Sequence, residues 1–246
     1  MAVYIIGATS GVQAEVDATP KALRTILYDS AGNPLVVDGD DRLLVSPRPP
    51  AIGSLGGYSL NAETGAIAAT LAANSPLFAF RWSDATRLAL IEHITVSVAI
   101  SGTITTAVAT SLEAIVARSW TASDTGGTQV TFANNGGKSN ANKTSMGATL
   151  VGDIRIAGTA ALTAGTRTLD NNGIGGVNYG TGTTAGTGGM GKTDLYRYSA
   201  DEGYPIIFAQ NEGFIIRNPD AGPATGTFKV MITVRWTEVL ASSFNL

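Results

Sequence analysis

The sequence predicts a mainly β protein, an antiparallel β-sandwich of jelly-roll type with an extended N-terminal arm and a long glycine-rich loop. Composition is the first observation behind this fold class: 30 of the 246 residues are glycine, none is cysteine, and only 14% are charged, where about 25% is usual. The second is that two long segments alternate apolar and polar residues with a period of two, as half-buried strands do. A chain of this length can bury one large β core without disulfides.

The N-terminal part is expected to be extended and then to enter the domain. Residues 1–20 show little periodicity and end at Pro20, which indicates an arm, and residues 21–246 are expected to form a single β-sandwich domain. Strands are predicted at 23–28 and 35–37, on either side of a turn rich in Asp, Gly, Asn and Pro. Three prolines then make residues 47–57 a connector.

The strongest strand signal in the first half is the segment 88–100. Its polar residues His93, Thr95 and Ser97 fall on one parity. The opposite parity carries Leu88, Leu90, Ile94, Val96, Val98 and Ile100. This alternation predicts one buried and one wet face. A shorter strand is predicted at 77–82, whereas residues 105–120 fit either a short amphipathic helix or a strand.

The second half contains a glycine-rich insertion and a clear C-terminal strand. Eleven of the 34 residues from 158 to 191 are glycine, so this stretch buries too little apolar surface to offset its ordering entropy. We expect a long loop that is mobile in a monomer and ordered by neighbouring subunits. A hairpin is predicted within 204–218, and residues 228–236 alternate as a strand with one wet side.

Charge and hydropathy exclude several classes of protein. The net charge is −3 and no lysine- or arginine-rich run occurs, so direct nucleic-acid binding is not expected. No apolar stretch approaches the roughly 20 residues of a membrane-spanning helix. The N-terminus also lacks the basic region of a secretory signal, which predicts synthesis in a cytoplasm.

Two sequence motifs suggest nucleotide binding, and both are interpreted as chance matches. Residues 186–193, GTGGMGKT, match a phosphate-binding loop, but no apolar strand precedes them. Residues 3–13, VYIIGATSGVQ, resemble the opening of short-chain dehydrogenases, but Gln13 replaces the third glycine and the family's Tyr and Lys pair is missing. No cofactor site is predicted.

No catalytic or metal site is predicted either. His93 is the only histidine, and it is interpreted as an ordinary strand residue, because no nucleophile motif accompanies it. The cluster Asp38, Asp40 and Asp41 could bind calcium, but it lacks the spacing of a calcium loop and fits a solvated turn. The sequon that begins at Asn142 is expected to be inert without a signal peptide.

A family resemblance rests on the order of several sequence blocks. They are GATSGVQAEVDA (7–18), KALR (21–24), ARSWTAS (117–123), TSMG (144–147), DIRI (153–156), AQNEGFIIRN (209–218) and VRWTEV (234–239). Together they resemble a poorly characterised group of tailed-bacteriophage virion structural proteins. The resemblance implies a non-enzymatic particle component.

The expected function is therefore that of a capsid decoration or cement protein in the virion. Its partners would be copies of itself, with a trimer as one form, and the major capsid protein. The arm 1–20 and the loop 158–191 are the expected bridging segments. Two alternatives stay open: a tail or fibre component, and a carbohydrate-binding jelly roll. The latter is weakened because Trp82, Trp120 and Trp236 lie in or beside predicted core strands.

Overall fold

The computed structural model describes residues 55–131, 153–199 and 204–243, together with the backbone of four short strands at 5–6, 13–16, 23–25 and 140–143. The chain divides into two compact units, residues 1–47 and 48–246. The protein is mainly β, as expected from the sequence. Within the described residues, the helical structure is the 3-10 turn η1 (Ala241–Ser243).

The first unit contains a small antiparallel sheet in the order β1-β2-β3. Its strands are β1 (Ile5–Ile6), β2 (Gln13–Val16) and β3 (Leu23–Thr25). The predicted strand at 23–28 is thus observed over three residues, and the predicted arm contains β1 and β2. The turn and return strand expected before residue 38 lie outside the described residues, and an arm ending at residue 20 stays a prediction.

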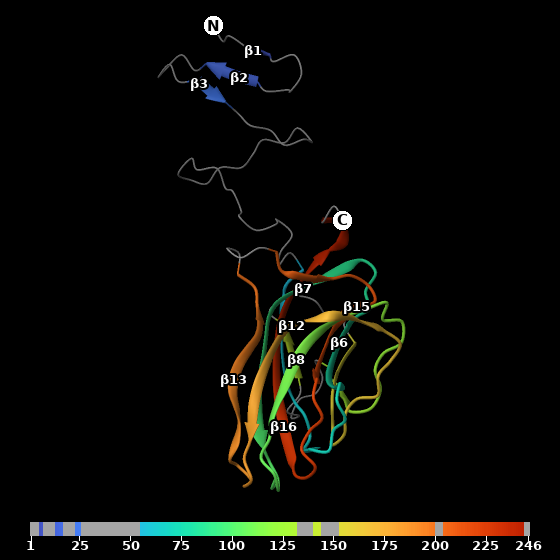
Figure 1. Ribbon diagram of the computed structural model, residues 1–246. Coiled ribbons are helices and arrows are strands. Elements are labelled where there is room, and N and C mark those ends of the chain that lie inside the picture. The colour runs from blue at the N-terminus through green and yellow to red at the C-terminus, as the bar shows by residue number, and fades with distance from the viewer. Residues whose placement is uncertain are drawn as a thin grey trace. The chain divides into compact units, whose positions relative to one another are not determined.

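The second unit is built from one extensive antiparallel sheet (Figure 1). Its order is β10-β4-β16-β7-β13-β12-β8-β15-β6-β11-β9, with β14 paired to β7 and β5 paired to β16. The strands are β4 (Gly57–Glu63), β5 (Ile67–Ala68), β6 (Ser75–Trp82), β7 (Arg87–Ile100), β8 (Ala109–Arg118), β9 (Thr128–Gln129), β10 (Asn140–Lys143), β11 (Asp153–Ile156), β12 (Thr168–Thr181), β13 (Gly188–Arg197), β14 (Ile206–Phe208), β15 (Glu212–Asn218) and β16 (Thr227–Leu240). The open alternative at 105–120 is therefore decided in favour of a strand.

The sheet curls so that its two halves pack face to face around the core. Phe80 on β6 meets Trp236 on β16 edge to face, with ring centroids 5.3 Å apart. Because β6 and β16 are far apart in the strand order, this contact requires the curl. The segments that follow β4 and β11 also meet, since the Gly65 amide donates a 3.3 Å hydrogen bond to the Ala157 carbonyl. The architecture is a curled antiparallel half-barrel.

The predicted alternation of the C-terminal strand is confirmed. The inward-facing residues of β16 are buried: Phe228, Val230, Ile232, Val234 and Trp236. The single parity predicted along 88–100 is wrong. The register between β7 and β16 shifts between Arg235 and Trp236, so Leu88 and Leu90 join a second apolar cluster with Val239, while Ile91 and Ile94 face the main core. A β-bulge changes the face of every residue on its far side.

The predicted glycine-rich loop is also corrected, because β12 and the first four residues of β13 lie within residues 158–191. The stretch cannot form a core alone, but β12 pairs along β8 and β13 along β7. Several glycines allow close backbone contact. The Leu195 carbonyl occupies the place of a Cβ at Gly175, and the Val98 carbonyl does so at Gly189, whose φ is 91°. Glycine serves tight packing here and not loop flexibility.

Candidate assembly surfaces and buried polar sites

In the described parts of both nucleotide-like motifs, the secondary structure differs from the one that nucleotide binding needs. Residues 186–193 form the end of a hairpin turn and the start of β13, whereas a phosphate loop must lead into a helix N-terminus. In the dehydrogenase-like segment, β1 pairs antiparallel with β2, whereas that motif needs a strand followed by a helix. The aspartates 38, 40 and 41 lie outside the described residues.

His93 lies on the outer face of the sheet in a row of basic side chains. Arg235 on β16 and Arg197 on β13 stand directly opposite His93 in the two neighbouring registers. His93 Nε2 is 2.8 Å from Asp194 Oδ1, a partially exposed contact. The arrangement agrees with a strand histidine held by one carboxylate.

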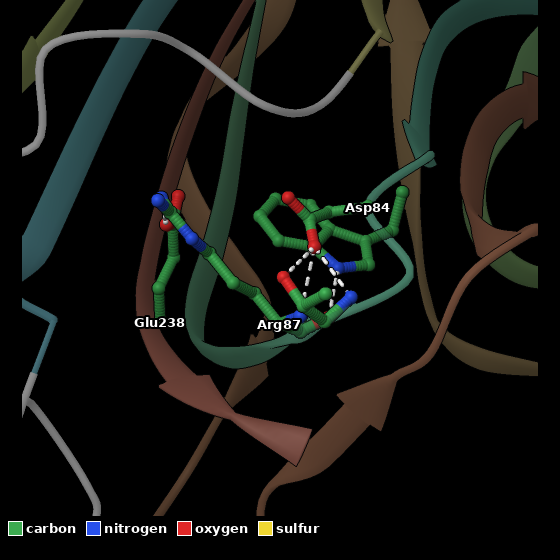
Figure 2. A network of polar contacts seen from close by, with 5 residues as sticks. Asp84, Arg87 and Glu238 are labelled. Carbon is green, nitrogen blue, oxygen red and sulfur yellow. Dashed lines mark hydrogen bonds and ion pairs between the residues drawn. The ribbon is translucent and has the colours of Figure 1, made fainter. Parts of the chain in front are cut away.

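A buried carboxylate was not foreseen from the sequence. The side chain of Glu238 on β16 is fully buried, and its Oε2 accepts a hydrogen bond of 3.2 Å from Arg87 Nη1 (Figure 2). Asp84, in the turn before β7, accepts hydrogen bonds from the backbone amides of Thr86 and Arg87 at 2.6 and 2.8 Å. This turn fixes the start of β7 and so places the guanidinium against Glu238. The sequence signal for this buried carboxylate was a single acidic residue, Glu238, between Trp236 and Val239.

The environment of Glu238 alters its ionisation. Burial raises the pKa of Glu238 above its usual 4.5, and hydrogen bonds from Arg87, Trp236 and Tyr58 oppose this rise without cancelling it. Hydrogen bonds to the backbone and side chain of Thr86 lower the pKa of Asp84 despite its partial burial. The two carboxyl groups therefore make the free energy of unfolding depend on pH with opposite signs.

A second buried ionic site fastens a layer of loops to the outside of the sheet. Arg167 forms an ion pair with the fully buried Asp124, and its guanidinium lies 4.7 Å from the ring centroid of Trp120. Burial lowers the pKa of Arg167 to about 10. Asp124 also accepts a 2.9 Å hydrogen bond from the Gly165 amide. The site joins the loop before β9 to the loop after β11, so its role is structural.

Arg81 on β6 donates hydrogen bonds to the same layer of loops. Its Nε donates to the Trp120 carbonyl at 2.7 Å, its Nη1 to Ser123 Oγ at 2.9 Å, and its Nη2 to Asn211 Oδ1 at 2.9 Å. One guanidinium thus joins the loop after β8 to the turn before β15. Sequence reasoning missed Arg81 and Arg167, because their partners lie about 40 or more residues away along the chain.

The pair β12 and β13 presents the most open surface among the described strands. In these two long strands only Tyr179, Thr181 and Leu195 are buried. The two strands pair with each other only at Gly180 with Gly189 and Thr181 with Gly188. They nevertheless lie in the middle of the strand order. One face of the pair packs partly buried residues such as Ile174, Val177 and Met190 against the core, and the other, exposed face is a candidate contact surface for another molecule.

Neither a protein-family model, nor a curated protein, nor a solved structure matches this chain significantly. Trp82, Trp120 and Trp236 are fully buried, so none can stack on a sugar. Within the described ranges there is no cluster of three His, Cys, Asp or Glu residues that could hold a metal ion. The same part of the chain contains no helix with the length and hydrophobicity to cross a bilayer.

Proposed function

We propose that this protein is a non-enzymatic structural protein of a tailed-bacteriophage virion, acting as a decoration or cement protein on the capsid. The ordered sequence blocks that resemble such proteins support the proposal, and so does the mainly β fold. In this proposal the protein is present in many copies that contact one another and the major capsid protein. The finer assignment of the fold as a jelly-roll sandwich belongs to the same proposal, and the face-to-face packing of the two half-sheets supports it.

The observation that carries the proposal is the exposure of β12 and β13. Their glycine-rich backbones are ordered as strands, yet their side chains bury little within the unit. A neighbouring subunit would cover these faces and add the apolar and backbone contacts that they lack. The segment 158–191 is therefore still proposed as a bridging element, now as a rigid ribbon and not as a loop.

The proposed mechanism is mechanical. Each copy would span a junction between capsid subunits and add buried surface that opposes outward pressure from packaged DNA. An interface of roughly 1,200–2,000 Å² is the usual size of a specific contact. A curled sheet whose segments after β4 and β11 are joined by a backbone hydrogen bond, from Gly65 to Ala157, suits a load-bearing role.

Copy number in purified virions tests this proposal. Quantitative mass spectrometry of particles should give hundreds of copies per virion for a capsid decoration protein. Tens of copies or fewer would assign the protein to the tail or a fibre, and absence from the particle would overturn the virion assignment.

Removal of residues 1–20 tests the proposed bridging arm. The truncated protein should lose its place on the particle while circular dichroism still reports the folded β unit. Unchanged occupancy of the particle would reject the arm as a bridging segment.

A further inference from the structure

Asn172 in β12 combines exposure with an unhindered neighbour. Within the described residues, Asn172 is the asparagine that a glycine follows, and both Asn172 and Gly173 are exposed. The carboxamide of an asparagine can react with the next backbone nitrogen most readily when glycine follows, because glycine has no Cβ to obstruct the approach. A second pair of this kind, Asn135 with Gly136, lies outside the described residues.

The pairing of β12 with β8 is interrupted on both sides of Gly173. Residues 170–172 lie opposite the single residue Val116 of β8, because the register shifts before Gly173. A second shift follows between Gly173 and Gly175. Bulges of this kind leave the extra residues unpaired and disrupt the ladder locally. Asn172 therefore lies in an irregular part of an otherwise long strand.

The other neighbour of β12, the strand β13, does not hold this segment in a ladder either. Among the described residues, the two strands pair at their hairpin end, Gly180 with Gly189 and Thr181 with Gly188. The segment 170–172 is therefore outside regular strand pairing on both sides, although β12 lies between β8 and β13 in the middle of the strand order (Figure 1).

Regular strand pairing protects an asparagine from this reaction. The backbone has to leave the extended conformation and release the next N–H from its hydrogen bond before the nitrogen can reach the carboxamide. A paired strand must therefore open locally first, and in core strands the free energy of opening approaches the global stability. At a bulge the opening costs less, because fewer ladder hydrogen bonds have to break.

We propose that Asn172 is a site of spontaneous deamidation in the folded protein. The backbone nitrogen of Gly173 attacks Cγ of Asn172 and forms a C–N bond. The bond between Cγ and Nδ2 breaks, and Nδ2 leaves as ammonia with the amide proton of Gly173. Solvent water then opens the resulting succinimide at either carbonyl carbon, where its hydroxyl stays, while its proton goes to the Gly173 nitrogen. The products are aspartate and isoaspartate at this position, and no group is oxidised or reduced.

The modification adds a negative charge close to an ion-pair network. Arg118 Nε donates to Asp170 Oδ1 at 3.0 Å, and Arg118 Nη1 donates to Glu212 Oε1 at 2.8 Å. A new carboxylate two residues from Asp170 adds like charge to this group, and isoaspartate also inserts a methylene into the backbone of β12. If β12 contacts a neighbouring copy, as in the proposed function, modified copies carry an altered contact face. The deamidation itself does not depend on the proposed function.

Peptide mapping of the full-length wild-type protein tests the site. The folded protein is incubated at neutral pH, and mass spectrometry follows the modified fraction of each asparagine. Asn178 is the internal control, because it is exposed in the same strand but lies in regular register with Ser111 and is followed by Tyr179. Asn172 should deamidate at least about ten times faster than Asn178, which corresponds to a difference of about 1.4 kcal/mol in activation free energy.

A second sample, unfolded in urea, separates the effect of the fold from that of the following residue. Folding should slow the deamidation of Asn178 by about a hundredfold or more, because its paired strand must open, but that of Asn172 by less than about tenfold. An Asn172 that stays unmodified in the folded protein, or that folding protects as strongly as Asn178, would overturn the inference. Virion copy number is a separate readout, so failure here does not decide the proposed function.

Discussion

The β7–β16 pair and the β12–β13 pair belong to the same sheet but are stabilised differently. The strand β16 packs large apolar residues such as Ile232 and Trp236 into the core along its whole inner face. In contrast, β12 contributes mainly partly buried residues such as Val177 and contacts its neighbours backbone to backbone at glycines such as Gly175. Burial of side chains fixes the first pair, whereas close backbone approach fixes the second. Strand structure therefore does not require a large apolar content when neighbouring strands supply the pairing.

The largest difference between the two pairs should arise from truncating an apolar side chain. Ile232→Ala leaves a cavity in the main core and should lower the free energy of unfolding by about 2–5 kcal/mol. Val177→Ala, the matched change in β12, should cost less than about 1 kcal/mol, because Val177 is only partly buried. Urea unfolding followed by circular dichroism measures both. Equal losses would show that β12 is held by its side chains after all.

A smaller effect should come from adding one methyl group to β12. Gly175→Ala places a Cβ against the Leu195 carbonyl and should destabilise the protein by about 1–3 kcal/mol. Gly180→Ala is the control in the same strand, since no atom lies within 4 Å of its Cβ, and a change within about 0.5 kcal/mol is expected.

The two glycine variants also distinguish a packed strand from a mobile loop. In a mobile loop, both substitutions would be tolerated equally. The same urea titrations decide the point, and matching midpoints for the two variants would contradict the role assigned to Gly175.

The smallest effect concerns the far end of β16, where Glu238 is buried. Its pKa is raised by burial, so the folded state binds more protons than the unfolded state at and above pH 4.5. The free energy of unfolding should therefore fall as the pH rises through the titration of Glu238 and should increase on acidification. Glu238→Gln should remove this slope, whereas Glu113→Gln, which changes another glutamate paired with an arginine, should keep it.

Asp84 provides an internal check on the sign. Its pKa is lowered, so its contribution to stability is present above the unfolded value of 3.8 and is lost as the pH falls through its folded-state pKa. Denaturant titrations from pH 3 to pH 8 separate the two windows. A rise of stability with pH above 4.5 that Glu238→Gln abolishes would contradict the assignment of Glu238.

The alternating segments were predictable because burial on one face leaves a period of two in the sequence. This holds for residues 228–236, where each inward residue is buried. The prediction failed along 88–100, because the bulge opposite Trp236 depends on the partner strand and leaves no mark in the periodicity. It also failed for β12, because the sequence shows how many glycines are present but not which backbone each one approaches.

Among the polar sites, the sequence contains two nucleotide-like motifs, of which residues 186–193 lead into the strand β13 and not into a helix. It did not reveal the pair of Arg167 with Asp124 or the network around Arg81, whose partners are distant along the chain. By itself, the sequence determined the β class, the alternating C-terminal strand and the low charge, since these follow from residue types and local order. The tertiary structure alone decided the curl of the sheet and the bulge in β7, because each depends on contacts between segments that the chain order does not place together.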